Sequence, residues 1–244
     1  MRFQVDVLFA GFSGRMSNGR LGWGTTALIR DDTHTILLDC GGMQIRSDIK
    51  DMLKQHGVAC EDVDTILLTH MHADHVYNLD YFPQAEIVLS RREWEHACDY
   101  ENKDFSVNEY AVCLLRSYKK RFIEQDGEEI IPGITAIFTP GHTPGSVSYA
   151  LQQEDALWVL SGDAIKNRGE LKFEEIQQSR SMADSLASLK KIKKMADRVL
   201  PGHDGWLTIK DGDVIPEGGN DVILEFGQGI KVNGETKITL TMGW

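Results

Sequence analysis

Short apolar segments, separated by polar turns, recur from the start of the chain and are typical of β-strands. Between the third and fourth of these segments, "DMLKQHG" within residues 45–57 has helical spacing, and Gly57 ends it. These alternating or β-rich runs predict a sheet from the start of the chain, and the helical segment is expected to cover it. The strands predicted in this half lie at residues 3–9, 25–31, 34–42, 63–70 and 85–90.

Helical and strand patterns continue to alternate in the second half. Ser90 and Glu93 have the spacing of a capping box, and a pair of helices is predicted between about residues 90 and 124. Another helix is predicted over residues 181–196, with leucines on one face and lysines on the other. Strands are predicted at residues 134–142, 146–151, 156–163 and 198–204. This alternation predicts an α/β fold, which we expect to form a single domain over residues 1–244.

The tail, residues 206–244, is rich in glycine and carries short alternating runs. Its Asn233-Gly234 pair, flanked by "GIKV" and "TKITLTM", predicts a β-hairpin. We therefore expect a C-terminal β extension, which either adds strands to a sheet edge or serves a homodimer.

The net charge of the chain argues against some classes of binding partner. The chain has 37 acidic and 26 basic residues, a net charge of −11, which argues against binding nucleic acid or an anionic membrane surface. No apolar run reaches the ~18 residues of a membrane span. The start of the chain reads as a strand and not as a signal peptide, and the four cysteines form no CxxC pair. We expect a cytoplasmic protein that acts on a small molecule.

The stretch "LLTHMHADHVYNL" crowds three histidines and an aspartate into six residues. Such groups are costly to bury and repel one another when protonated, so something must compensate them. Three further polar residues follow predicted strands and are framed by glycine, which permits sharp turns. The seven residues are His70, His72, Asp74, His75, His142, Asp163 and His203.

Imidazole and carboxylate groups suit zinc, and also iron or manganese. Seven ligands exceed the needs of one four-coordinate ion, whereas two ions that share a bridging carboxylate fit the number and leave room for a bridging water or hydroxide. The absence of cysteine from the set excludes a thiolate zinc finger. The isolated His34, His56 and His96 are interpreted as ordinary surface or core residues.

In order and spacing this ligand set resembles the metallo-β-lactamase superfamily, over roughly residues 5–206. The resemblance implies an αββα four-layer sandwich with two divalent metal ions, most simply Zn²⁺, at one edge. It assigns the first metal to His70, His72 and His142, the second to Asp74, His75 and His203, and Asp163 as the bridge between them. Asp39 in "LLDCGG" resembles an early aspartate of the superfamily; it either supports a ligand or is a simple turn aspartate.

Within that superfamily the ligand types favour hydrolysis of a small acyl compound by a metal-bridging hydroxide. His72 stands where flavodiiron proteins carry glutamate, and Asp163 where the commonest zinc β-lactamases carry cysteine. A lactone or related ester is the first expectation, and a thioester, as in glyoxalase II, is the alternative. A di-iron redox protein or a metal-bearing binding protein is the alternative of another class. No GxSxG serine-hydrolase motif is present.

Candidate substrate contacts are less well defined. Asp74 can orient the hydroxide. Lactonases of the superfamily carry a tyrosine three residues after the bridging aspartate, where this chain has Lys166; Tyr149 or Tyr77 can supply the phenol instead. The glycine-rich residues 11–24 form either a flap over the site or a mobile surface hairpin.

Overall fold

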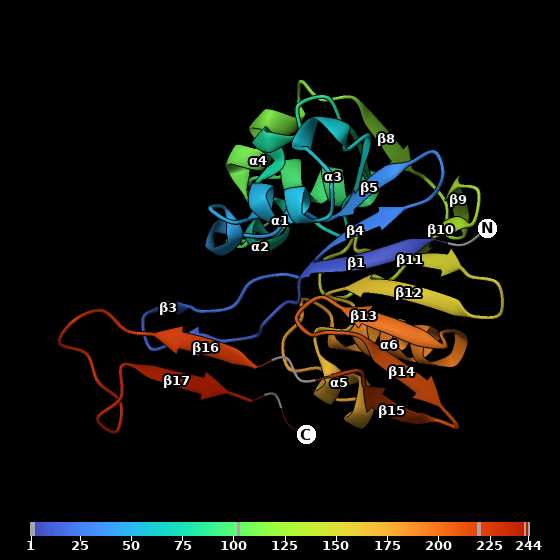
Figure 1. Ribbon diagram of the computed structural model, residues 1–244. Coiled ribbons are helices and arrows are strands. Elements are labelled where there is room, and N and C mark those ends of the chain that lie inside the picture. Colours follow the sequence, from blue (N-terminus) through green and yellow to red (C-terminus); the bar gives the residue numbers. More distant parts are fainter. Residues whose placement is uncertain (1–2, 102, 219–220, 242, 244) are drawn as a thin grey trace.

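Two β-sheets lie face to face at the centre of the molecule, and helices cover the outer face of each sheet (Figure 1). The computed structural model describes residues 3–101, 103–218, 221–241 and 243. Three clusters of buried apolar side chains separate the layers: one between helices and the first sheet, one between the sheets, and one between the second sheet and its helices. This four-layer αββα arrangement confirms the predicted fold class.

The first sheet has the strand order β1-β4-β5-β6-β7-β8. Its first three strands pair antiparallel, and β5 to β8 pair parallel. The strands are β1 (Gln4–Phe9), β4 (Thr26–Arg30), β5 (Thr35–Leu38), β6 (Thr65–Leu67), β7 (Glu86–Ser90) and β8 (Lys120–Ile123). The helices on this side are α1 (Ile49–Gln55), α2 (Ala73–Val76), α3 (Arg91–Cys98) and α4 (Glu109–Leu115), with short 3₁₀ turns at Met43–Ile45, Cys60–Asp62 and Leu79–Tyr81.

The second sheet has the order β15-β14-β13-β12-β11-β10-β9. Only β12 and β13 pair parallel in it, because α5 and α6 connect them across the outer face (Figure 1). The strands are β9 (Glu128–Ile131), β10 (Ile134–Phe138), β11 (Val147–Gln152), β12 (Leu157–Gly162), β13 (Arg198–Pro201), β14 (Leu207–Lys210) and β15 (Asp213–Pro216). The covering helices are α5 (Arg168–Phe173) and α6 (Met182–Met195), and α6 confirms the helix predicted over residues 181–196.

The central strands are apolar on both faces because both faces are covered. In β4, Leu28 packs toward the helices while its neighbour Ile29 packs between the sheets. In β12, Leu160 lies between the sheets and Val159 lies against the outer helices. Each strand therefore contributes alternate side chains to two apolar layers, which is why the sequence shows runs and not alternation.

The helical pair predicted over residues 90–124 is partly wrong. The segment contains α3 and α4, but Lys120–Ile123 forms β8, which pairs parallel with Ile87–Ser90 of β7. Phe122 and Ile123 pack into the two apolar layers on either side of the first sheet, and this tertiary burial overrides the local helical pattern.

The tail confirms the predicted C-terminal β structure in part. β14 and β15 extend the edge of the second sheet, and β16 (Val222–Glu225) and β17 (Lys237–Leu240) form a separate hairpin that projects from the body (Figure 1). Asn233 and Gly234, both with positive φ (53° and 89°), make a tight turn inside the loop that joins β16 to β17, where Val232 and Glu235 form an isolated bridge. The partner strand, however, is "VILE" and not the predicted "GIKV". Use of the tail in a dimer stays a prediction.

Among the described residues, no helix combines the length and the apolar character needed to cross a membrane.

Candidate metal centre

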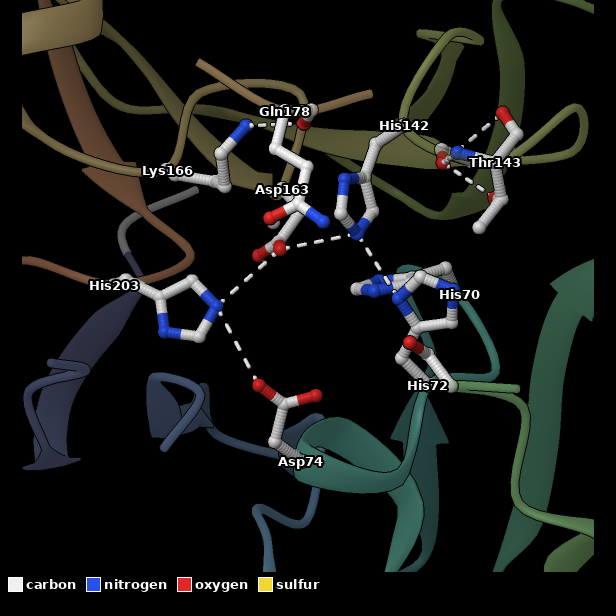
Figure 2. Close-up of polar contacts among 12 residues, drawn as sticks. His70, His72, Asp74, His142, Thr143, Asp163, Lys166, Gln178 and His203 are labelled. Atoms are coloured by element: carbon white, nitrogen blue, oxygen red, sulfur yellow. Dashed lines mark hydrogen bonds and ion pairs between the residues drawn. The ribbon is translucent and has the colours of Figure 1, made fainter. Parts of the chain in front are cut away.

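The seven predicted ligands meet where loops from both sheets converge. All of them except His75 are labelled in Figure 2. They form three groups in which one ligand atom from each residue lies within 4.8 Å of the others. The loops that deliver these residues follow β6, β10, β12 and β13. The groups are His70, His72 and His142; His70, His75 and Asp163; and Asp74, His75 and His203.

The local backbone explains how one short motif supplies four side chains. His70 and His72 precede α2, and His72 is its N-cap in an extended conformation (φ −70°, ψ 151°). Residues two apart in extended backbone point to the same side. The single helical turn that follows then brings Asp74 and His75 to the same cluster, while His75 stays fully buried.

Asp163 lies at the centre of the cluster. Its Oδ2 is 3.2 Å from the Nε2 atoms of both His142 and His203, and its Oδ1 is 3.3 Å from His75 Nε2. Outside these contacts, His142 Nε2 lies 3.0 Å from the Nδ1 of His72. Oδ2 therefore faces one histidine of each predicted ligand set, His142 and His203, and Oδ1 faces His75, so the Asp163 carboxylate lies between the two sets.

Several buried atoms of this cluster have no hydrogen-bond partner within the described part of the chain. They are His70 Nε2, His75 Nε2, His142 Nδ1 and Asp163 Oδ1. Burying such groups without a partner costs roughly 1–3 kcal/mol each. Cations at the centre would satisfy three of them, because His70 Nε2, His75 Nε2 and Asp163 Oδ1 belong to the groups described above. The residues present therefore fit metal ions.

The pKa shifts of three residues in the cluster also agree with metal binding. Burial, reinforced by His75 and His72, lowers the pKa of His70 well below its usual value. Burial also lowers the pKa of His142 to about 3, although Asp163 acts in the opposite direction. Burial acts to raise the pKa of Asp163, but the surrounding histidines hold it well below the ordinary value. The neutral imidazoles of His70 and His142 and the ionised Asp163 carboxylate are the forms that bind metals. Burial also acts to lower the pKa of His75 and His203, but the Asp163 carboxylate raises both above the ordinary value.

Hydrogen bonds outside the cluster fix which nitrogen of the His75 and His70 rings faces it. Asp39 Oδ2 accepts from His75 Nδ1 at 2.7 Å and from the Thr69 hydroxyl at 2.8 Å. That hydroxyl can then accept from His70 Nδ1, 3.0 Å away. Both rings thereby turn Nε2 toward the centre. Of the two interpretations of Asp39, the structure supports contact with a predicted ligand, and the carboxylate also accepts from Thr69 N at 2.8 Å.

The rings of His203 and His72 are also oriented by hydrogen-bond partners, which the sequence does not reveal. His203 Nδ1 donates to the Trp23 carbonyl at 2.8 Å, and His72 Nε2 lies 3.2 Å from Asp104 Oδ2. Asp104 is shared with His96, whose Nε2 is 3.0 Å away, so His96 is more than an ordinary core residue. The histidine ligands of known metal sites are commonly held in this way.

Replacing Asp39 by asparagine should weaken metal binding without unfolding the chain. Asp39 has φ 49°, a conformation that asparagine tolerates, so the backbone is retained. The amide lacks one acceptor for the donors of Thr69 and His75, and we expect metal affinity to fall roughly 10–100-fold. Competition with a chromophoric chelator measures this loss. Asp32→Asn, an exposed change on a nearby turn, is the control; equal affinity of both variants would contradict the role of Asp39.

Glu93 on α3 joins two of the loops that carry ligands, a role that the sequence did not indicate. Its buried carboxylate accepts from Met71 N at 2.8 Å and from the Thr143 hydroxyl at 2.6 Å. Ser90 caps the helix by accepting from Glu93 N, so only half of the predicted capping box is present. The Glu93 side chain instead connects the motif loop to the loop of His142.

Glu93→Ala should destabilise the fold by about 2–4 kcal/mol, because a buried amide loses its acceptor and a cavity remains. Glu93→Gln keeps one carbonyl oxygen and should cost about 1 kcal/mol. Urea denaturation followed by circular dichroism gives both values. Glu95, exposed on the same helix, supplies the control variant Glu95→Ala. A Glu93→Ala midpoint that matches this control would show that the connection is unimportant.

The structure corrects the prediction that Tyr149 is catalytic. It lies on β11 in the core between the sheets, fully buried, and its hydroxyl donates to the Leu68 carbonyl at 2.8 Å. A phenol enclosed in this way cannot reach a substrate, so a catalytic role for Tyr149 is wrong. Tyr77 borders a neighbouring cavity of about 700 Å³, together with Asp74, and its role stays a prediction.

Lys166 does lie beside the cluster (Figure 2). Its ammonium pairs with Glu170 Oε1 at 2.8 Å and donates to the Gln178 carbonyl at 3.0 Å. A substrate oxygen would have to compete with these two partners. The structure thus places Lys166 at the site, and its catalytic role stays a prediction.

A cavity of about 550 Å³ opens above the ligands. His72, Asp74, His142, Asp163 and His203 line its floor, and residues of the glycine-rich segment 11–24 line a wall. In that segment β2 (Arg15–Met16) and β3 (Gly19–Arg20) form a small hairpin. The structure therefore places the predicted flap beside the site.

The comparisons with known proteins agree with this architecture. Metallo-beta-lactamase domain-containing protein 1 of Xenopus laevis is 28% identical over 202 residues, which cover 82% of this chain and 78% of that protein. An N-acyl homoserine lactonase of Bacillus cereus is 29% identical over 158 residues, which cover 63% of this chain and 60% of the lactonase. The match therefore spans less than two thirds of that lactonase's length.

Solved structures show the same fold. An N-acyl homoserine lactone hydrolase, with the product N-hexanoyl-L-homoserine bound at its catalytic metal centre, superposes with a TM-score of 0.66 at 21% identity, covering 83% of this chain and 93% of that one. The dizinc quorum-quenching lactonase AidC gives 0.68 at 20% identity, with 80% and 79% covered. Residues 21–203 match the sequence profile of the metallo-beta-lactamase superfamily. The chain therefore belongs to the metallo-beta-lactamase superfamily.

Proposed function

We propose that this chain is a dinuclear metal-dependent hydrolase that cleaves a small acyl compound, a lactone or a related ester. The observation that carries the proposal is Asp163, whose two oxygens face separate histidines at 3.2–3.3 Å within a buried cluster. One buried carboxylate between two ligand sets supports a pair of ions. The imidazole and carboxylate donors, with no thiolate, favour zinc over softer metals. The relatives named as lactonases support the substrate class.

The residues around the cluster have separable roles in this proposal. When bound, the metal ions would supply Lewis acidity that lowers the pKa of a water molecule and polarises the scissile carbonyl. Asp163 holds the two ligand sets together. In this proposal Asp74, which borders the cavity and has one oxygen 3.5 Å from His203 Nε2, orients the attacking water and accepts its proton.

Proton release by the zinc-reconstituted protein tests this function across lactones, oxygen esters, thioesters, β-lactams and phosphodiesters. We expect turnover of lactones or oxygen esters that a chelator abolishes and added zinc restores. Faster turnover of thioesters would move the substrate class to the alternative. No turnover of any class, in a protein that holds metal, would contradict the hydrolase and favour a redox or binding role, which an iron-loaded sample would test by its redox spectrum.

A further inference from the structure

Two arginines face each other across the β2–β3 hairpin at the wall of the cavity. Arg15 and Arg20 are directly opposite partners in the antiparallel register, and both are exposed. Like charges directly opposite each other destabilise a strand pair. The hairpin has two residues in each strand, so it has little packing of its own to offset the repulsion. An anion held between the two guanidinium groups would remove this cost.

The protein itself does not supply that anion. Arg15 donates to the side-chain carbonyl of Gln178, and Arg20 donates to the Ser106 hydroxyl at 3.0 Å; both acceptors are neutral. Among the described residues, no carboxylate lies within 4.0 Å of either guanidinium group. Arg30, Arg46 and Arg198 have carboxylate partners, whereas Arg92 and Arg116 resemble Arg15 and Arg20 in having none among the described residues.

The hairpin is attached firmly to the metal centre. At its base, Phe12 and Trp23 exchange two backbone hydrogen bonds of 2.9 and 3.0 Å, and their rings lie 5.4 Å apart. The Trp23 carbonyl also accepts the hydrogen bond from His203 described above. Arg15 and Arg20 line the same cavity as His203 and Asp163. A substrate that reaches the metal ligands therefore lies within the field of both arginines.

We propose that Arg15 and Arg20 bind an anionic group, a carboxylate or a phosphate, on the part of the substrate remote from the scissile bond. The inference rests on the proposed function and deepens it, because it selects anionic acyl compounds over neutral ones. Guanidinium groups match the planar oxygens of both anions and form charge-assisted hydrogen bonds with them. Bulk charge does not provide this attraction, since the chain carries a net charge of −11.

Paired esters with the same scissile bond test the proposal. The mono-4-nitrophenyl esters of adipate, pimelate and suberate keep a free carboxylate at three spacings, and their methyl-capped counterparts are neutral. For the zinc-reconstituted protein we expect kcat/KM to favour the best anionic ester by at least about tenfold, a preference that falls with added salt. In the double variant Arg15→Gln/Arg20→Gln, the ratio of kcat/KM for the anionic ester to kcat/KM for its neutral counterpart should fall by about the same factor. Arg92→Gln/Arg116→Gln, which removes two exposed charges elsewhere, should keep the wild-type ratio.

Calorimetry separates failure of this inference from failure of the proposed function. Titrations of adipate and of 5-phosphonopentanoate into the same proteins measure anion binding whether or not any ester is hydrolysed. A Kd at least about tenfold weaker in Arg15→Gln/Arg20→Gln, but not in the control, supports the anion site, and the tighter of the two ligands identifies the preferred anion. Equal ester kinetics for the charged and neutral pairs, or Kd values that the double variant does not change, would overturn it.

Discussion

Replacing Asp163 by alanine is expected to abolish hydrolysis while the chain keeps its fold. The Asp163 carboxylate is the only group among the described residues that lies within 3.3 Å of His75, His142 and His203 together. Without it the two ligand sets lose their common partner, and we expect kcat/KM to fall at least about 10³-fold, a loss of about 4 kcal/mol of transition-state stabilisation. Initial rates and metal content of the purified variant measure the effect.

Two further variants show whether the loss of activity is specific to the Asp163 carboxylate. Asp163→Asn retains one carbonyl oxygen at the same position, so it should keep more metal than the alanine variant and still lose most activity. Asp213→Ala removes an exposed carboxylate that pairs with Lys172 on the far edge of the second sheet, and it should retain wild-type rates. Unchanged turnover by Asp163→Ala would eliminate the bridging role of this residue.

Gly202→Ala should damage the same site without removing any ligand. An added Cβ at Gly202 would lie 2.1 Å from Asp163 Oδ1 and 2.8 Å from the Gly162 carbonyl carbon, far inside van der Waals contact. The Asp163 carboxylate or the backbone must shift, and overpacking of this kind costs about 1–3 kcal/mol of stability. Because a displacement near 1 Å can cost roughly 100-fold in rate, we expect a loss of at least that size in kcat/KM.

Gly227→Ala is the matched control, because an added Cβ there meets no atom within 4 Å. Thermal unfolding and initial rates, measured on both variants, separate the two effects. A Gly202→Ala protein with full activity would show that the close approach of the β12 and β13 loops is not needed to position Asp163.

The ligand set was predictable because four of its members form one short motif after an apolar strand, and the other three follow apolar strands in glycine-framed loops. That pattern is local: His142, Asp163 and His203 stand out within a few residues of sequence. The alternation of strand and helix patterns predicted an α/β fold. The four-layer αββα arrangement was predicted only through the resemblance that the order and spacing of the ligands carry.

The supporting residues were not predictable, because their roles arise only when distant loops meet. Asp104 follows His72 by 32 residues and Glu93 follows Met71 by 22, without any motif that connects them. The error at Tyr149 has the opposite cause. Its neighbours Val147 and Leu151 also face the core between the sheets, so strand alternation turns the phenol inward and away from the cavity.

The pairing of Arg15 with Arg20 was not predictable either, for a different reason. The glycine-rich segment was predicted as a possible flap, but the pairing of two arginines depends on the register of a hairpin with only two residues in each strand. One residue of slippage would place the two side chains on opposite faces. Register of so short a hairpin is set by its anchored base at Phe12 and Trp23, which the sequence does not reveal.

Metal content measured by plasma mass spectrometry tests the central claim most directly. The protein is stripped with a chelator, reconstituted with zinc and dialysed, and metal is then counted per chain. We predict two ions per chain in the wild-type protein, held by a cluster in which buried atoms of His70, His75 and Asp163 have no hydrogen-bond partner among the described residues. One ion or none, in protein that circular dichroism shows to be folded, would contradict a dinuclear centre.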